Sequence, residues 1–155
     1  MSLTKRINEQ LQKAPPDQAV AIGAAEGKLR LELKLADSSR LGCLLDRLHL
    51  EHTEGGQLAV DPAQIVERMT YLGERLEIIE TEGEKGMTIL RSTPPRVDGE
   101  VISFYEMVLE ESTRLSLVRY KYDPETEERT PMPAPLTRDT LERLISDLIE
   151  LGRGK

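Results

Sequence analysis

The sequence predicts a single α+β domain over residues 1–155, in which an antiparallel, meander-like sheet of about five to six strands is packed by about three to four helices. Three observations predict this class. Leucines alternate with charged residues over residues 28–35, which is typical of a strand with one buried and one solvated face. The second half holds strand-like segments joined by short turns. Apolar residues with helical spacing occur near both ends of the chain.

The first 14 residues predict an amphipathic helix. Leu3, Ile7 and Leu11 are spaced four apart and therefore share one helical face, with Ser2 or Thr4 as the cap. Two prolines at positions 15 and 16 end the pattern, because proline cannot continue a helix. We expect the helix over residues 2–13.

Residues 19–37 predict a weak strand of small residues, a Glu26-Gly27 turn and a strong second strand. One face of the second strand carries Leu29, Leu31, Leu33 and Leu35, and the other carries Lys28, Arg30, Glu32 and Lys34. The leucine face predicts contact with the core. The charged face mixes both signs, so we interpret it as solvated surface, with a docking face for a charged partner as the alternative.

Residues 38–52 fit two patterns. Leu41, Leu44, Leu45 and Leu48 have the spacing of a helical stripe, whereas residues 47–52 alternate as in a strand. We interpret the segment as a short helix, capped by Ser38 or Ser39, that passes into a strand near Leu48. Gly55-Gly56 provides the next break.

A second helix is predicted over residues 61–74. Asp61-Pro62 combines a capping side chain with a first-turn proline. The buried stripe is formed by Ile65, Val66, Met69, Leu72 and Leu76.

The following 50 residues predict sequential strands. Segments 76–82 and 87–92 flank a turn at residues 83–86, and a Pro94-Pro95 loop leads to two longer strands, 100–112 and 114–123. If residues 111–113 form a three-residue turn, the cross-strand pairs are Leu109 with Leu115, Met107 with Leu117, and Phe104 with Tyr120.

The C-terminal part predicts a stiff connector and a last helix. Alternate prolines in residues 131–135 exclude a central strand and favour an edge strand or a polyproline II passage. A helix over residues 137–152 begins at the cap Thr137 and ends at Gly152. Its buried stripe consists of Leu141, Leu144, Ile145, Leu148 and Leu151.

Composition narrows the classes of partner. The net charge of -7 disfavours nucleic acid and anionic membrane surfaces, because both carry negative charge. The single Cys43 cannot form an internal disulfide, and no segment has the apolar length of a signal peptide or a membrane span, so a cytoplasmic protein is expected. No glycine-rich phosphate loop occurs in the sequence, and no cofactor is predicted.

Cys43, Asp46, His49 and His52 are the weak candidates for a metal site or a cysteine-based enzyme. Their spacing of three places Cys43 and His52 on opposite sides of a helix, and on a strand it places His49 and His52 on opposite faces. Only a pair could converge, so further ligands would have to come from distant residues. Leucines around Cys43 would raise the pKa of its thiol, and we assign no catalytic residue.

The strands near residues 104 and 120 hold four of the five aromatic residues. The candidate binding face consists of Phe104, Tyr105, Arg119, Tyr120, Lys121 and Tyr122. Tyrosine and arginine are enriched in protein interfaces, so the sequence favours a non-catalytic protein-binding, adaptor or chaperone-like domain with a protein partner. Homodimerisation is also expected, because the sheet offers more apolar surface than so few helices can bury. Small acidic α+β secretion chaperones have a similar size and charge. No motif in the sequence supports this comparison, so it is an analogy at the level of class.

Overall fold

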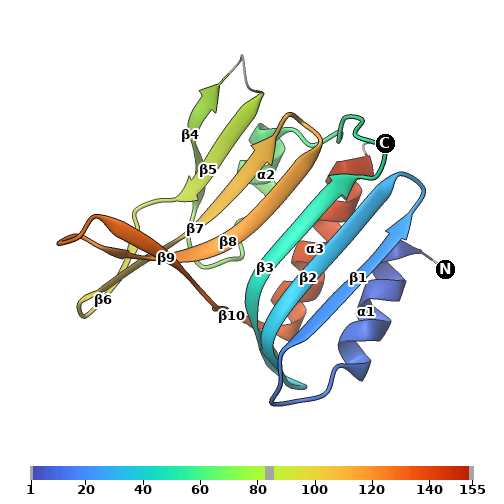
Figure 1. The fold of residues 1–155 in the computed structure, drawn as a ribbon, viewed down its shortest axis with the longest axis horizontal. Coiled ribbons are helices and arrows are strands. Elements are labelled where there is room, and N and C mark those ends of the chain that lie inside the picture. The colour runs from blue at the N-terminus through green and yellow to red at the C-terminus, as the bar shows by residue number, and fades with distance from the viewer. Residues whose placement is uncertain (1, 83–85, 154–155) are drawn as a thin grey trace.

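A computed structural model describes residues 2–82 and 86–153 of the chain (Figure 1). Within these residues the chain forms three helices and one antiparallel sheet of ten strands. The helices are α1 (Leu3–Lys13), α2 (Pro62–Arg68) and α3 (Arg138–Arg153). The strands are β1 (Val20–Glu26), β2 (Leu29–Ser38), β3 (Gly42–His52), β4 (Leu76–Glu82), β5 (Met87–Ser92), β6 (Arg96–Asp98), β7 (Val101–Glu110), β8 (Arg114–Asp123), β9 (Glu128–Met132) and β10 (Ala134–Thr137).

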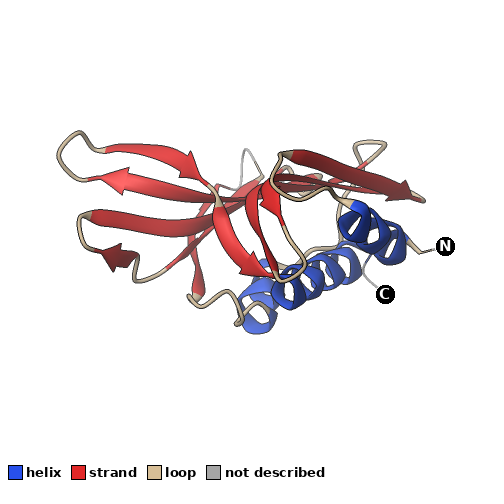
Figure 2. Cartoon of the chain, turned by 90° about the horizontal axis from the view of Figure 1, so that it is seen from below, coloured by secondary structure: helices blue, strands red, loops and turns tan. Residues whose placement is uncertain are grey.

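The molecule has two layers, with all three helices on one face of the sheet (Figure 2). The main strand order is β1-β2-β3-β8-β7-β5-β4, while β6 pairs with β7, β9 with β8 and β10 with β3. We call the helix-covered side the inner face and the opposite side the outer face. Among the described residues, no helix is both long and apolar enough to cross a membrane.

The leucines of β2 lie on the inner face, as the alternation predicts. Leu31, Leu33 and Leu35 are at most 1% exposed, and they belong to the same core as the buried stripes of α1 and α3. Burial of each leucine side chain stabilises the fold by about 2 kcal/mol, so this row holds the sheet and the helices together. The charged residues of β2 consequently point outward.

Residues 42–52 form strand β3 throughout, so the predicted short helix at residues 40–47 is wrong. The helical stripe fails because Leu41 is 86% exposed and Leu44 is 37% exposed. The buried residues of β3 instead alternate as in a strand, and this alternation shifts by one residue at a single point. The shift occurs at Asp46, which is skipped where the pairing with β2 passes from Leu45 to Arg47. Pairing with strands on both sides thus overrides the local helical spacing. The sheet is larger than predicted, and the helices are fewer than the predicted upper number.

Helix α2 begins as predicted but ends early. The Asp61 side chain accepts a hydrogen bond from the Ala63 backbone N–H at 3.0 Å, and Pro62 occupies the first turn. The helix stops at Arg68 and not at residue 74, because Met69 already has non-helical backbone angles. The next residues are irregular, with a bend over residues 72–74, and lead to β4.

The β7–β8 hairpin has the predicted register. Leu109 pairs with Leu115, Met107 with Leu117, and Phe104 with Tyr120. Residues 111–113 form the connection, with Glu111 and Ser112 at positive φ. Residues 83–85 of the other predicted turn lie outside the described residues.

The β7–β8 hairpin changes its neighbours along its length. Residues 114–117 of β8 pair with β3, whereas residues 119–123 pair with β9. Residues 106–110 of β7 pair with β5, whereas residues 101–103 pair with β6. The second set of pairings forms a four-stranded arm, β6-β7-β8-β9, that extends beyond the helices (Figures 1 and 2).

The predicted proline-rich connector, residues 131–135, spans the end of β9, Pro133 and the start of β10, and each of these strands pairs with one strand only. This agrees with the expected edge position, because proline lacks the N–H that a central strand needs. β10 approaches β3 closely at Gly42, where a Cβ atom would lie 2.8 Å from the Leu136 carbonyl oxygen. Glycine at this position therefore permits the pairing.

Side chains of α1 cap the exposed edge of β1. Gln10 donates from Nε2 to the Gly23 carbonyl oxygen at 2.8 Å, and the Gly23 N–H donates to Gln10 Oε1 at 3.2 Å. Arg6 also donates to the Ala25 carbonyl oxygen. An edge strand can pair with another chain through its free backbone N–H and C=O groups. In β1, side chains of α1 already form hydrogen bonds with such groups.

Candidate functional site

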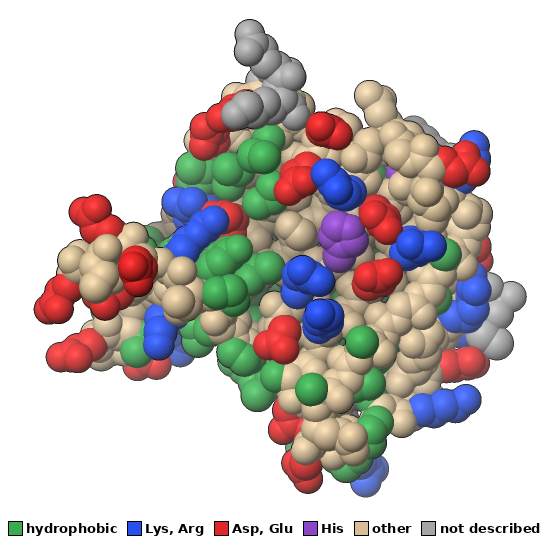
Figure 3. Space-filling view, in the orientation of Figure 1, with side chains coloured by type: hydrophobic (Ala, Val, Ile, Leu, Met, Phe, Trp, Pro, Cys, Tyr) green, Lys and Arg blue, Asp and Glu red, His purple; other side chains and the backbone are tan. Residues whose placement is uncertain are grey.

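The outer face of the sheet has a charged part and an apolar part. Figure 3 shows basic and acidic side chains around a histidine over β2 and β3, and hydrophobic side chains gathered over β4, β5, β7 and β8. Three open hollows lie on this face, and we name them the polar, middle and apolar hollows. Ligand sites favour concave surfaces, so the outer face is the candidate binding surface.

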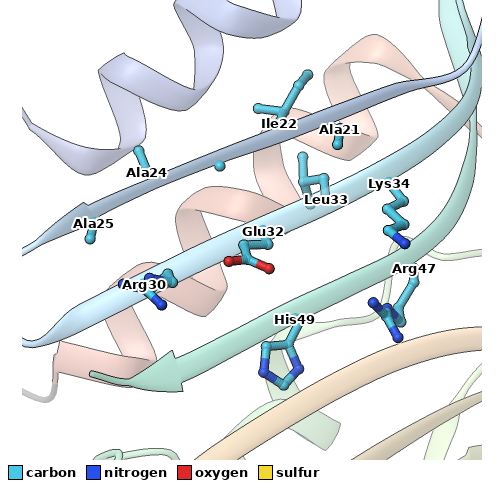
Figure 4. A pocket seen from close by; sticks show the side chains of 11 residues that line it. Ala21, Ile22, Ala24, Ala25, Arg30, Glu32, Leu33, Lys34, Arg47 and His49 are labelled. Atoms are coloured by element: carbon cyan, nitrogen blue, oxygen red, sulfur yellow. The ribbon is translucent and has the colours of Figure 1, made fainter. Parts of the chain in front are cut away.

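The polar hollow has a volume of about 500 Å³ and lies over β1, β2 and β3 (Figure 4). Its charged and polar lining comes from Arg30, Glu32, Lys34, Arg47 and His49. On β1 the residues opposite the β2 charges are small, because Ala21 pairs with Lys34 and Gly23 pairs with Glu32. The small residues leave space beside the long charged side chains.

Lys34 and Arg47 form an unusual pair of like charges. They stand directly opposite one another in the β2–β3 ladder, and Figure 4 shows them side by side. Like charges in that position repel and destabilise a sheet. Among the described residues, no carboxylate lies within ion-pair distance of either cation, whereas neighbouring Arg30 has Glu51 at 3.4 Å. The pair can therefore accept an external anion.

The middle hollow, of about 340 Å³, continues from the polar hollow across β8 and β7. Arg47 and His49 line both hollows. On the far side Tyr120 lines the middle hollow, and its ring lies 6.0 Å from that of Phe104 in the apolar hollow. The three hollows therefore form a path across the strands.

The apolar hollow has a volume of about 600 Å³ and lies between the β4–β5 hairpin and the four-stranded arm. Its lining consists of Ile79, Ile89, Arg91, Ser92, Thr93, Pro95, Ile102, Phe104, Glu106, Tyr122 and Arg129. The lining combines isoleucine and aromatic side chains with a small charged group. Such a composition fits an apolar ligand group oriented by a few polar contacts.

Glu106 is the buried charge beneath the apolar hollow, with a side chain only 3% exposed. Its Oε2 accepts hydrogen bonds from Arg91 Nη2 at 2.8 Å and Arg129 Nη1 at 2.6 Å. The hydrogen bond to Glu106 raises the pKa of Arg129. The two guanidinium groups also lie over the aromatic rings of Phe104 and Tyr120, at 5.0 and 4.2 Å. Because two cations surround one carboxylate, the rim of the apolar hollow, formed by Arg91 and Arg129, has an excess of positive charge.

The six candidates for the binding face do not share one surface. Phe104, Tyr120 and Tyr122 point to the outer face, where they line the apolar and middle hollows. Tyr105 and Arg119 are buried, at 3% and 5% exposure, and belong to the inner side of the hairpin. Lys121 is an exposed residue of the arm and has the same strand parity as Arg119.

Arg119 is the centre of a buried polar cluster at the end of the inner face. It forms an ion pair with Glu74 at 2.9 Å, donates to Ser103 Oγ at 2.7 Å and lies 4.6 Å from the Tyr105 ring centre. Ser92 links the same group, since its hydroxyl donates to Glu74 at 2.9 Å and accepts from the Tyr105 N–H at 2.8 Å. Burial raises the pKa of Tyr105. Because these side chains are one another's partners, the cluster stabilises the position of the β7–β8 hairpin.

The four weak metal candidates lie apart along β3. Cys43 is buried, His49 lines the outer hollows, and Asp46 occupies the position that the register skips. His52 is the last residue of β3, and its Nδ1 accepts a hydrogen bond from the Gly56 N–H of the following turn at 2.9 Å. The described residues contain no group of three or more His, Cys, Asp and Glu side chains arranged to hold a metal ion.

The thiol of Cys43 is expected to react slowly. It is 7% exposed, and burial raises its pKa, an effect that the charge of Arg138 opposes. A buried thiol with a raised pKa provides little thiolate at pH 8. We expect modification by a disulfide reagent to be at least about tenfold slower in the native protein than in protein unfolded with guanidinium chloride. Equal rates in the two states would contradict the buried position of this residue.

Sequence patterns alone did not identify the apolar hollow. Ile79, Ile89, Arg91 and Arg129 come from three strands that are brought together by the pairing of β5 with β7 and of β9 with β8. One available signal was the pair Ile78-Ile79, since two adjacent isoleucines on an edge strand cannot both face the core. Both are exposed, at 46% and 45%.

A comparison of the chain with known protein families, with curated proteins and with solved structures finds no match.

Proposed function

We propose that this protein is a non-catalytic binding domain that holds an extended segment of a partner protein on its outer face. The observation that carries the proposal is the apolar hollow, in which isoleucine side chains and Tyr122 remain partly open to solvent beside the buried Phe104 ring and a buried carboxylate. Apolar side chains of a partner would remove this surface from water, which contributes about 25 cal/mol per Å² of apolar area.

The occupant is an apolar side chain with a negatively charged neighbour. Arg91 and Arg129 share a single carboxylate, and their side chains are 37% and 43% exposed, so the rim attracts an anion. Aromatic residues and arginine at the centre of a hollow resemble the composition of interface hot spots. Because the hollow is formed by paired strands, its backbone is already ordered, and binding would cost this protein little conformational entropy.

The alternative, an enzyme centred on Cys43, Asp46, His49 and His52, has no comparable geometric support. Nucleophilic catalysis requires a base within hydrogen-bond reach of the nucleophile. Cys43 is buried on the inner side of β3, whereas His49 opens to the outer hollows. The two side chains therefore do not form a nucleophile–base pair.

The test uses isoleucine methyl NMR spectroscopy of the whole chain. The probe is a blocked heptapeptide with leucine at alternate positions and serine between, compared with an all-serine peptide. We expect saturable shifts at the methyl groups of Ile79, Ile89 and Ile102, which line the apolar hollow. The buried isoleucines, including Ile7 and Ile65, provide internal references.

Two adjacent residues provide a matched pair of variants. Ile79→Ala removes a lining residue of the apolar hollow, whereas Ile78→Ala removes a neighbour of nearly equal exposure that does not line it. We expect Ile79→Ala to weaken peptide binding about fivefold and Ile78→Ala to leave it unchanged. Equal effects of the two substitutions would contradict the proposal. Concentration-dependent shifts at the same methyl groups without peptide would make a second copy the occupant, and the claim of a separate partner would fail.

A further inference from the structure

The polar and apolar hollows lie on one row of the outer face. Strand pairing places Lys34 opposite Arg47, Val118 opposite Glu106, and Glu106 opposite Arg91. The pairing of Leu48 with Leu117 brings Arg47 beside Val118 and joins the two parts of the row. The row therefore runs across β2, β3, β8, β7 and β5, with the middle hollow between its two ends.

The length of this row matches a simple repeat of an extended chain. The midpoint of Lys34 and Arg47 is three strand intervals from the midpoint of Glu106 and Arg91, or about 14 Å at about 4.8 Å per interval. In an extended peptide, side chains four residues apart point to the same side and are separated by about 13 Å. One segment that crosses the strands can thus reach both hollows with residues i and i+4.

The charges at the Lys34 end of the row favour an anion. Lys34 and Arg47 are cross-strand neighbours of the same sign, with no carboxylate in ion-pair distance among the described residues. Glu32 lines the same hollow, but it stands opposite His49 in the ladder. A carboxylate placed between the two cations would remove their repulsion and form two charge-assisted hydrogen bonds.

We propose that the partner segment is an extended chain with an apolar residue in the apolar hollow and an acidic residue four positions away, bound between Lys34 and Arg47. This inference rests on the proposed function and specifies the partner's chemistry. The acidic residue fits a protein with a net charge of -7 because the charge is unevenly distributed. At this point of the outer row, Lys34 and Arg47 form no ion pair within the described part of the chain.

The test uses blocked, serine-based peptides that contain one leucine and one glutamate. In the first the two residues are four apart, in the second they are two apart, and in the third glutamine replaces glutamate at a spacing of four. Each peptide is also made in the reversed order, because the chain direction is not specified by the row. We expect the best peptide of spacing four to bind about three- to tenfold more tightly than its glutamine counterpart, with that difference reduced at high salt.

Variants of the protein test the same contact. Lys34→Gln and Arg47→Gln should each remove most of the preference for glutamate. Arg30→Gln is the matched control, because Arg30 lines the same hollow and carries the same charge but already has Glu51 as its partner. We expect Arg30→Gln to retain the preference.

The readouts separate the two proposals. Methyl shifts at Ile79 and Ile89 report the apolar hollow, and backbone amide shifts at Lys34 and Arg47 report the acidic contact. If the isoleucines respond equally to the glutamate and glutamine peptides of spacing four, in both orders, the binding function stands and the acidic contact is refuted. If no peptide shifts the isoleucines, the proposed function itself fails.

Discussion

Arg119→Met is expected to lower the free energy of unfolding by about 3–5 kcal/mol, because it leaves Glu74 as an unpaired charge in a largely buried site. The two side chains are 5% and 12% exposed, and their ion pair at 2.9 Å joins β8 to the segment before β4. The substitution also removes the hydrogen bond to Ser103. Urea denaturation followed by far-ultraviolet circular dichroism measures the change.

The control for this prediction is Arg114→Met on the same strand. Arg114 pairs with Glu110 at 3.0 Å, but the two side chains are 50% and 43% exposed, so we expect a loss below about 1 kcal/mol. The double variant Glu74→Met with Arg119→Met should recover much of the stability that Arg119→Met loses, since it leaves no uncompensated charge. A loss for Arg119→Met no larger than that for Arg114→Met would show that the buried pair is unimportant.

Leu48→Ala is expected to cost about 3–5 kcal/mol, because it opens a cavity in the centre of the sheet. Leu48 is 0% exposed and pairs with Leu33 on one side and with Leu117 on the other. Neighbouring strands hold the backbone in place, so the cavity cannot collapse fully. Chemical denaturation of the variant against the unmodified protein provides the measurement.

Leu44→Ala is the matched control on the same strand. Leu44 is 37% exposed, so we expect a loss of less than about 1 kcal/mol. The comparison also distinguishes the observed strand from the helical interpretation of residues 40–47, in which Leu44 and Leu48 would share one buried stripe. Similar losses at the two positions would therefore favour the helix over β3.

The parts of the fold that could be predicted are those specified by nearby residues. The alternation in β2 identifies its leucine face, the spacing in α1 identifies its buried stripe, and a three-residue turn determines the register of the β7–β8 hairpin. Each signal lies within about 20 residues, where periodicity and turn geometry are informative.

The parts that could not be predicted depend on distant pairings. β3 is a strand over its whole length because β2 pairs on one side and β8 and β10 pair on the other, and β8 and β10 lie far along the sequence. The same limit applies to the candidate site. Alternation places Phe104, Tyr120 and Tyr122 together, but only the pairing of β5 with β7 adds Ile89 and Arg91 to make a hollow. Local patterns contain no signal for this neighbour.

The capped edge of β1 has a consequence for how copies of the chain can associate. If two molecules joined their sheets antiparallel through β4, at the other end of the strand order, the combined sheet would have β1 at both ends. Gln10 and Arg6 engage backbone groups of β1, so neither end would offer a template for a third molecule. Along the main strand order such an association is self-limiting: it closes as a two-fold pair, and the capped β1 edges do not extend it.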